Sequence, residues 1–525
     1  MNKTNTSDRN VYKIKRTKAY WILCWILLLA VVGQSQPNPC GTIATRSKWL
    51  KSYQQHPERF AKDNGNTIYV PMTIHLLGSD EGRGYFSTNS FLDAFCRLQL
   101  DFEEANIRFY VAGEFNYINN SRWNNHEDIP TGIEMMFSNN VENTLNVYFV
   151  SDPAGNCGYN LPYAGIANSK SCSGPNDHTW AHEVGHALTL PHPFLGWEGG
   201  VSHDGSVEHS YNNPAPREVY YDYTLFQQEL VTADTIIIDT ALVELMDGTN
   251  CYEAADGFCD TAPDYLSSRW NCNASTESNT TQTDPNGETF KSDASLIMSY
   301  ANDNCASRFT PEQIAAMRTF LVDQRSNWLY NQSPAPELGT EEIVAEIPLD
   351  DGQAPTQGTY FEWNPVENAT HYIFQLSRLA TFPFKTVDTV LTTNSLTLLE
   401  DLQTDKTYYW RVRPFNNYSA CNTFSTTFSF EASAVTNTQQ ILTPADLNVF
   451  PNLLSEGSNL QIKASKAFQQ VQFKLYDLQA RLLETATLDI AAGNQSLPFQ
   501  PSSKGVYFLE IQAETMVRTV RLVVE

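Results

Sequence analysis

Residues Trp180–Phe194 read W-A-H-E-V-G-H-A-L-T-L-P-H-P-F, and this stretch predicts a helix that carries a metal site. His182 and His186 are four positions apart, so a helix places both imidazoles on one face, one turn apart. A tetrahedral zinc ion can take one nitrogen from each. Glu183 follows the first histidine at about 100° round the helix, where it can reach a metal-activated water.

A third histidine follows where the helix is expected to end. His192 lies six residues after His186 and would point about 240° away from it on a continuous helix. Pro191 and Pro193 flank His192 and oppose continuation of the helix. The chain can therefore turn back after the helix and present His192 as a third metal ligand.

The composition describes a folded, acidic, multidomain chain. Its 525 residues are enough for roughly three or four domains. A content of 41% hydrophobic and 18% charged residues is typical of globular proteins rather than disordered ones. The net charge of −25 argues against nucleic acid as a partner, because nucleic acid favours a basic face. A secreted protein is compatible with this charge.

The N-terminus predicts a secretory signal peptide over residues 1–35. Basic residues precede an apolar run, Trp21–Val32, and the polar stretch Gly33–Gln36 follows it. The run of about 12 residues is short for a bilayer, which takes about 20, so an uncleaved anchor is the weaker alternative. No later stretch is apolar enough to span, and we expect no transmembrane segment in the mature protein.

Nine cysteines remain after residue 35, and export permits them to form disulfides. Their odd number leaves at least one thiol free or paired elsewhere. Cys157 and Cys172 flank a loop before the predicted helix, where we expect a bridge. Four others allow three pairings, among which the sequence does not choose: Cys251, Cys259, Cys272 and Cys305. Zinc binding by these four is the alternative, but they lack any C-x-x-C spacing.

The catalytic part of the chain is expected to have an α+β fold. Strands are predicted at Thr67–Leu77, Ile107–Val111 and Leu145–Val150, and a helix at Asn89–Asn106. Thr310 opens a further helix with a capping box. Residues 36–66 are interpreted as a pro-region, or alternatively as the first turns of a domain that extends over residues 67–332.

Two all-β sandwich units are predicted after the linker that begins at residue 333. Residues 333–440 contain short aromatic strands and resemble a fibronectin type III module. Residues 441–525 contain V-F-P-N at Val449–Asn452, Y-D-L-x-x-R at Tyr476–Arg481 and a G-V-Y-F-L strand. They resemble the C-terminal sorting domain of type IX secretion cargo in Bacteroidetes. This resemblance implies the type IX machinery as a partner, and a secreted or surface-attached location.

The histidine motif and a downstream Met298-Ser299-Tyr300 resemble the metzincin zinc metalloproteases, most closely the pappalysin-like (cytophagalysin) branch, over about residues 67–330. The resemblance implies that zinc is held by His182, His186 and His192. It also implies that Glu183 is the general base, that Met298 forms the Met-turn below the metal and that Tyr300 stabilises the transition state. H-E-x-x-H alone would also suit a core helix with two satisfied histidines.

One residue departs from the metzincin motif, which has glycine where this chain has Thr189. Glycine tolerates a positive φ at the turn that follows the helix, whereas a β-branched residue does so poorly. Either the backbone turns differently here, or His192 is not the ligand. In the second case His203 and His209 are the substitutes.

Cys40-Gly41-Thr42 matches a pro-region motif of the same branch, in which the cysteine can bind the zinc and block the site. Cys40 is therefore a candidate latency thiol, because a thiolate is a good zinc ligand. A disulfide, for example with Cys96, is the alternative.

The interpretation that follows is a secreted zinc endopeptidase acting on proteins or peptides. A degenerate protease domain, with the fibronectin-like module as an adhesin, is the alternative function, and an exopeptidase is a third. Calcium is also expected in the acidic loops around Asp247–Asp264, without a defined ligand set.

Overall fold

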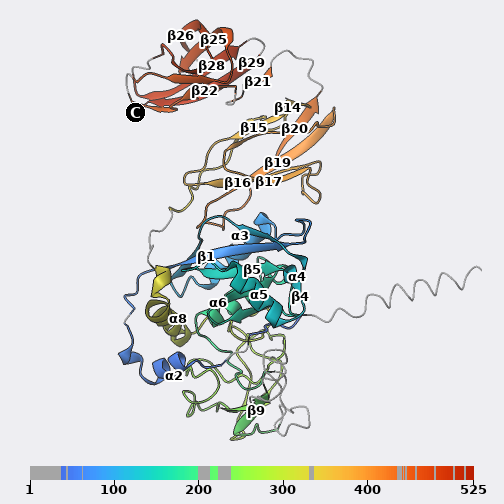
Figure 1. Ribbon diagram of the computed structural model, residues 1–525, viewed down its shortest axis with the longest axis vertical. Coiled ribbons are helices and arrows are strands. Elements are labelled where there is room, and N and C mark those ends of the chain that lie inside the picture. Colours follow the sequence, from blue (N-terminus) through green and yellow to red (C-terminus); the bar gives the residue numbers. More distant parts are fainter. Residues whose placement is uncertain are drawn as a thin grey trace, which may run out of the picture. The chain divides into compact units, whose positions relative to one another are not determined.

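The computed structural model describes residues 37–524, apart from 43–44, 62, 199–212, 223–237, 330–335, 434–439, 442, 444–445, 456–457, 478–480, 500–502 and 514–515. The predicted signal peptide lies outside the described residues. The chain divides into two compact units, one up to Ser333 and one from Pro334 onward (Figure 1). Strands predominate over helices, and the expectation of a multidomain chain is confirmed.

The first unit is organised round a mixed sheet whose central strand is β1 (Ile68–Gly78). The strands are ordered β2-β1-β5-β8-β7, and β3 also pairs with β1. β7 is antiparallel to β8, and the other pairs are parallel. The other strands of the sheet are β2 (Ile107–Val111), β3 (Asn116–Asn119), β5 (Leu145–Val150), β7 (Gly158–Leu161) and β8 (Gly165–Ser169). The three strands predicted here are therefore present.

Two helices cover one face of this sheet, α3 (Thr88–Asp101) and α6 (Thr179–Ala187). The ring of Phe149, in β5, lies 5.0 Å from that of Trp180 in α6. Phe91 of α3 lies 5.8 Å from the same indole. All three side chains are almost fully buried, so this aromatic cluster fixes α6 against the sheet.

The opposite face packs against α5 (Ile129–Asn139). Side chains alternate along a strand, so Tyr148 and Val150 point away from Phe149 and join Met135 of α5 in a second buried cluster.

The predicted helix over Asn89–Asn106 was too long. α3 ends at Asp101, and turns lead to Asn106, which has φ 51°. This left-handed residue cannot continue a helix, and it redirects the chain into β2.

The helix α8 (Pro311–Gln324) closes the first unit as predicted, with Thr310 and Gln313 forming the capping box. Shorter elements of this unit are α2 (Lys48–Gln55), η1 (Pro57–Arg59), α4 (Ser121–Asn124), β4 (Asn125–His126), β6 (Asp152–Pro153), η2 (Lys170–Cys172), β9 (Glu218–Asp222), β10 (Ile238–Leu242), β11 (Gln282–Thr283), β12 (Thr289–Phe290) and η3 (Ser326–Leu329).

Disulfides tie the loops on both sides of α6. The expected bridge between Cys157 and Cys172 is present. The structure also selects one of the three pairings of the later cysteines: Cys251–Cys259 and Cys272–Cys305. These four cysteines are therefore disulfides and not zinc ligands.

The second unit contains two hydrophobic cores, each between two sheets. The first core centres on Trp363 and Trp410. Its sheets have the orders β13-β15-β18 and β14-β20-β19-β16-β17. Their strands are β13 (Ala345–Ile347), β14 (Gly352–Pro355), β15 (Tyr360–Trp363), β16 (His371–Ser377), β17 (Val387–Leu391), β18 (Ser395–Thr397), β19 (Lys406–Phe415) and β20 (Phe428–Ser433).

The second core lies between a sheet ordered β21-β29-β28-β25-β26, with β23 on β29, and a sheet ordered β22-β24-β27. Their strands are β21 (Gln440–Ile441), β22 (Leu447–Phe450), β23 (Leu453–Leu454), β24 (Gln461–Ala464), β25 (Phe468–Asp477), β26 (Leu482–Ile490), β27 (Gly493–Ser496), β28 (Gly505–Ala513) and β29 (Met516–Val524).

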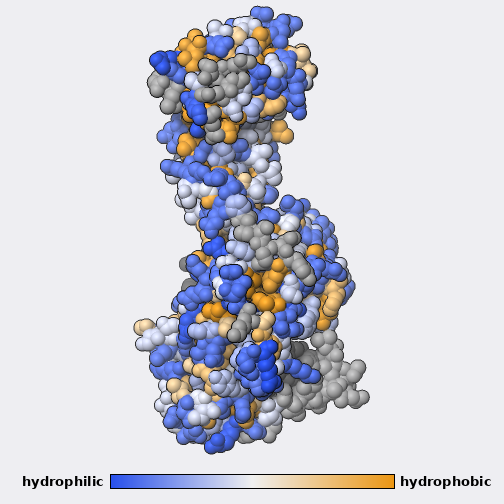
Figure 2. All heavy atoms as spheres, turned by 90° about the vertical axis from the view of Figure 1, so that its left-hand side faces the viewer, coloured by the Kyte–Doolittle hydropathy of each residue, from blue (hydrophilic) through white to orange (hydrophobic). Residues whose placement is uncertain are grey.

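The visible surface is mainly hydrophilic. Figure 2 shows one face of the molecule, where hydrophilic residues predominate and hydrophobic residues gather in small groups. Within the described part of the chain, no helix is long and apolar enough to cross a bilayer.

Candidate metal centre

The turn after α6 decides where the third histidine lies. The amide of Leu190 donates to the carbonyl of Gly185 (2.9 Å), and that of Thr189 donates to His186 (3.0 Å). This pair of bonds is a Schellman motif, which requires a left-handed residue after the helix. Thr189 is that residue, with φ 85°. The backbone thus adopts the turn that favours glycine, and it does so with a β-branched side chain.

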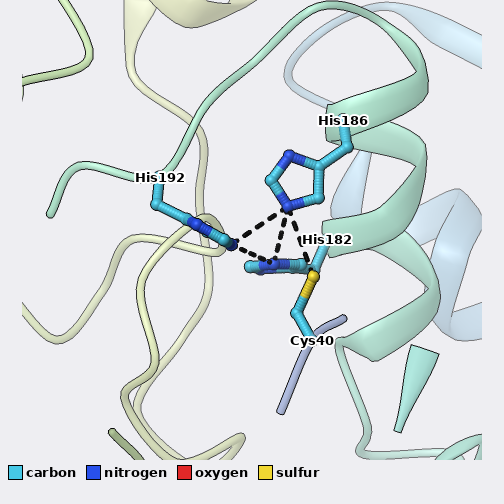
Figure 3. Close-up of side chains that lie close together, drawn as sticks. All are labelled: Cys40, His182, His186 and His192. Atoms are coloured by element: carbon cyan, nitrogen blue, oxygen red, sulfur yellow. Dashed lines mark hydrogen bonds between the residues drawn. The ribbon is translucent and has the colours of Figure 1, made fainter. Parts of the chain in front are cut away.

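The turn brings the three predicted histidines together (Figure 3). The Nε2 atoms of His182 and His192 are 3.2 Å apart, and that of His186 is 3.1 Å from each. Two of the rings come from α6, and His192 approaches from the loop that follows. All three are buried. The alternatives His203 and His209 lie outside the described residues.

Each of the two helical rings is held through its other nitrogen. The Nδ1 of His182 lies 2.8 Å from the carbonyl oxygen of Ile297, and that of His186 lies 2.7 Å from the carbonyl of Leu190. A carbonyl oxygen only accepts hydrogen bonds, so both Nδ1 atoms donate.

The fixed tautomers leave Nε2 without hydrogen. Burial lowers the pKa of His182 and His192 to about 3 and holds that of His186 well below its usual value, so the rings are neutral. The short contact between the Nε2 atoms of His182 and His186 then cannot be an ordinary hydrogen bond, because each atom offers only a lone pair. A cation between the three rings satisfies their lone pairs. Zinc–nitrogen bonds of ~2.0–2.1 Å in a tetrahedron place nitrogens about 3.3 Å apart, close to the spacing found.

Figure 3 shows that Cys40 approaches the Nε2 atoms of the three histidines from the side opposite to the ring of His186. Its Sγ lies 3.6 Å from the Nε2 of His186, and tetrahedral zinc with sulfur and nitrogen ligands predicts about 3.5 Å. Cys40 and the three histidines form one group whose ligand atoms all lie within 4.8 Å of one another. The thiol is free, so the structure does not contain the alternative disulfide with Cys96.

The segment that carries Cys40 lies along the edge strand β7. The amide of Gly41 donates to Gly158 (2.8 Å), and the amide of Cys157 donates to Asn38 (2.7 Å). Asn38 and Asn156 form a parallel bridge. Residues 37–42 therefore run beside residues 155–158 and cross the candidate metal centre, with a bend at Pro39.

Glu183 is fully buried next to this peptide. Its Oε2 accepts a hydrogen bond from the hydroxyl of Thr42 at 2.8 Å. The same hydroxyl accepts from the amide of Asn160 at 2.8 Å. The other carboxylate oxygen, Oε1, has no hydrogen-bond partner among the described residues. Burial raises the pKa of Glu183 to about 8, which suits a group that exchanges a proton near neutral pH.

Met298 and Tyr300 lie beside the centre, as their predicted positions require. Met298 is fully buried, and its sulfur occupies the space that a side chain at Gly185 would need. The Tyr300 hydroxyl donates to the carbonyl of Cys40 at 3.3 Å, and its ring lies 5.0 Å from that of His192. Tyr300 thus faces a peptide carbonyl next to the metal centre.

Glu198 is a site residue that the sequence analysis missed. Its Oε1 lies 3.3 Å from the Nδ1 of His192, and its Oε2 accepts from the amide of Gly196 at 2.7 Å. Carboxylates commonly orient a metal-binding histidine in this way. An acidic residue directly after the apolar run that ends at Trp197 was the available signal.

The acidic loops hold a second group of buried carboxylates. Glu244 and Asp256 each have an oxygen without a hydrogen-bond partner among the described residues. Burial, reinforced by Asp256 and Asp264, raises the pKa of Glu244 to about 10. Burial also raises the pKa of Asp256, to about 7, although the guanidinium of Arg46 opposes this shift. A further cation would favour the charged form of both carboxyls.

Comparison with known proteins bears on the C-terminal part. Residues 448–525 match the family of secretion system C-terminal sorting domains. The predicted type IX sorting domain is confirmed. It indicates export by that secretion machinery to the cell surface or beyond. The sequence matches no curated protein.

Similarity to solved structures is weak. A mutant form of promirolysin from Tannerella forsythia is 16% identical, with a TM-score of 0.37 over 55% of this chain and 97% of that chain. An α-L-rhamnosidase of Streptomyces avermitilis is 11% identical, with a TM-score of 0.15 over 35% and 24%. The BSP domain of a biofilm-associated protein is 10% identical, with a TM-score of 0.20 over 37% and 31%.

The left-handed turn generates a stability prediction. Thr189→Gly should raise the free energy of unfolding by about 1 kcal/mol, because it relieves a left-handed β-branched residue. The Thr189 hydroxyl also contacts that of Ser47 at 3.3 Å, so Thr189→Ala is the matched control that removes the hydroxyl and keeps Cβ. Urea unfolding, followed by tryptophan fluorescence, measures the free energy of unfolding of both variants. A glycine variant less stable than the alanine variant would contradict the strain.

Proposed function

We propose that the chain is a secreted zinc-dependent endopeptidase. The observation that supports it best is the segment 37–42, which crosses the three-histidine centre with backbone hydrogen bonds to residues 155–158, at the start of β7. A polypeptide therefore fits this cleft in the conformation that a substrate would need. We further propose that the first unit is a metzincin of the pappalysin-like branch, and that residues 333–440 are a fibronectin type III module.

In this proposal His182, His186 and His192 hold the zinc. The ion would supply Lewis acidity, which polarises a carbonyl group and lowers the pKa of water towards ~7. Glu183 takes the proton of the attacking water through the unpaired Oε1 and then delivers it to the leaving amine. Tyr300 donates a hydrogen bond to the carbonyl oxygen that becomes negative, as it now does to Cys40.

Replacement of the base tests the chemistry. Glu183→Gln keeps the size and the acceptor for Thr42 but cannot take a proton, so casein cleavage should fall by ~10²–10⁴. Bound zinc, measured by mass spectrometry of the metal, should stay at one per chain. Glu134→Gln is the control, because Glu134 is half exposed on α5 and pairs with Arg122. Full activity of Glu183→Gln would refute the mechanism. Bound zinc without cleavage of any peptide by the wild type after removal of residues 36–66 would favour the adhesin alternative.

We also propose that residues 36–66 keep the peptidase latent. The sulfur of Cys40 lies beside the three histidines, where a fourth metal ligand would bind. The hydroxyl of Thr42 donates a hydrogen bond to the carboxylate of Glu183, the proposed base. The segment is anchored elsewhere by Arg46, which donates to the carbonyl of Tyr252 at 2.7 Å, and by Trp49, which donates to Asp323 at 2.7 Å. Latency then depends on both the metal position and the base being occupied.

Removal of the thiol should release activity without cleavage of the chain. Cys40→Ala is expected to cleave peptide substrate in the unprocessed form, whereas the unprocessed wild type stays inactive, because a thiolate no longer competes for the zinc. Electrophoresis of the same samples verifies that the pro-region is intact. Lys51→Ala, at an exposed position of α2, is the control and should remain latent. An inactive Cys40→Ala precursor would exclude the thiol as the lock.

For the acidic loops we propose a calcium site that includes Glu244 and Asp256. Calcium binds carboxylate and carbonyl oxygens, and both residues offer a buried oxygen without a partner in the described part of the chain.

Calcium should stabilise the protein through these residues. At a concentration 100 times Kd it adds ~2.7 kcal/mol, so the melting temperature measured by calorimetry should rise. Glu244→Gln should lose most of this rise. Asp247→Asn, in the same acidic stretch but on the surface, should keep it. Equal rises in both variants would place calcium elsewhere.

A further inference from the structure

A cavity of about 600 Å³ opens from the metal centre towards the C-terminal end of α8. Ligand pockets typically have ~300–1,000 Å³. His186 and Thr189 from the metal centre line it. The cavity is also lined by Arg325, directly after α8, by Trp328 in η3, and by Tyr163 at the turn between β7 and β8. A peptide bound at the histidines therefore has room to place a side chain near Arg325.

Aromatic rings hold the Arg325 side chain in position. Its guanidinium carbon lies 4.7 Å from the ring centre of Tyr163, 5.1 Å from that of Trp328 and 5.3 Å from that of Phe320. Such contacts stabilise a cation and restrict its rotamers, while they leave its hydrogen-bond donors free. Tyr163 has a left-handed backbone, with φ 62°, and is 78% exposed, so no core packing explains its position.

Within the described part of the chain, no side chain or carbonyl group is recorded as an acceptor for this guanidinium. Arg325 has no ion-pair partner among the described residues, and its Nε is buried without an acceptor. Arg318, in the same helix, shows the opposite arrangement. It binds Asp63 through two nitrogens and donates to carbonyl groups, as a structural arginine does. A half-buried cation without a counter-ion is unfavourable unless an anion joins it.

The rest of the cavity does not supply that anion. Its other charged lining residues are Lys48 and Glu142, both exposed. Lys48 belongs to the pro-region, so removal of that region leaves one surface carboxylate and Arg325. Neutral amides such as Asn140 and Asn327 line the remaining polar wall. The cavity is therefore suited to a ligand carboxylate that reaches the half-buried guanidinium of Arg325.

We propose that Arg325 forms a specificity subsite that takes the carboxylate of an aspartate or glutamate side chain in the substrate, near the bond to be cleaved. This inference deepens the proposed peptidase function and rests on it, because only a peptidase would have a peptide substrate at this site. A guanidinium offers a planar pair of donors that matches a carboxylate, and the rings hold it ready for that contact. Arg325 is a specificity-determining residue here and takes no part in bond cleavage.

Binding to an inactive chain tests the subsite apart from catalysis. The full chain with Cys40→Ala and Glu183→Gln is titrated with fluorescent peptides, amidated at the C-terminus, that carry Glu, Gln or Lys in turn at each position. At one position Glu should bind about tenfold tighter than Gln, a usual margin for a charged hydrogen bond. Arg325→Gln should abolish this preference, and Arg325→Glu should reverse it in favour of Lys.

Controls separate the subsite from general charge and from folding. Arg122→Gln removes an exposed arginine that pairs with Glu134, and it should leave the preference unchanged. Thermal melting of Arg325→Gln shows whether the fold is kept, and Arg325→Lys should retain a weaker preference. No binding, or equal binding of Glu and Gln peptides, would overturn the subsite, as would a preference that appears only with a free C-terminal carboxylate. Failure of the peptidase proposal itself would show separately, as absence of zinc and of cleavage by the processed wild type.

Discussion

The hydrogen bonds between imidazole Nδ1 atoms and backbone carbonyls are the constraint on which the centre depends. The carbonyls of Ile297 and Leu190 can only accept, so they fix the tautomer and the orientation of His182 and His186. Both carbonyls belong to turns whose shape has another cause. Ile297 precedes Met298 under α6, and Leu190 closes the Schellman motif. The centre is therefore assembled by backbone geometry that surrounds the helix, and the helix alone contributes only the spacing.

Part of this arrangement could be predicted from the sequence, because it depends on local spacing. The histidine positions on α6 and the end of the helix before Pro191 follow from the helical period and from proline geometry. The capping box at Thr310 also depends on neighbours in the chain, and it is present. Strands such as Leu145–Val150 were predicted to the residue because β-branched and aromatic side chains are concentrated there.

The rest depends on contacts between distant segments. Glu198 orients His192 across a tight loop, and nothing in the spacing shows which way its carboxylate points. Thr189 was expected to resist a left-handed turn, yet the surrounding bonds impose it. The pairing of Cys272 with Cys305, 33 residues away, needs the tertiary fold. Arg325 lies far beyond His186 in the sequence and meets the same cavity only because α8 packs next to the β7–β8 turn.

The edge position of β7 has a consequence for what this cleft can accept. β7 pairs with β8 on one side, and on its other side it offers amides and carbonyls to the segment that contains Gly41. Binding through these groups depends first on the backbone conformation of the bound segment, and only then on its side chains. A chain segment must give up its own helix or sheet bonds to lie there. Under the proposed peptidase function, folded proteins would therefore be cut first at loops and frayed ends. The local unfolding of the substrate, as much as its sequence, would then determine which bond is cleaved.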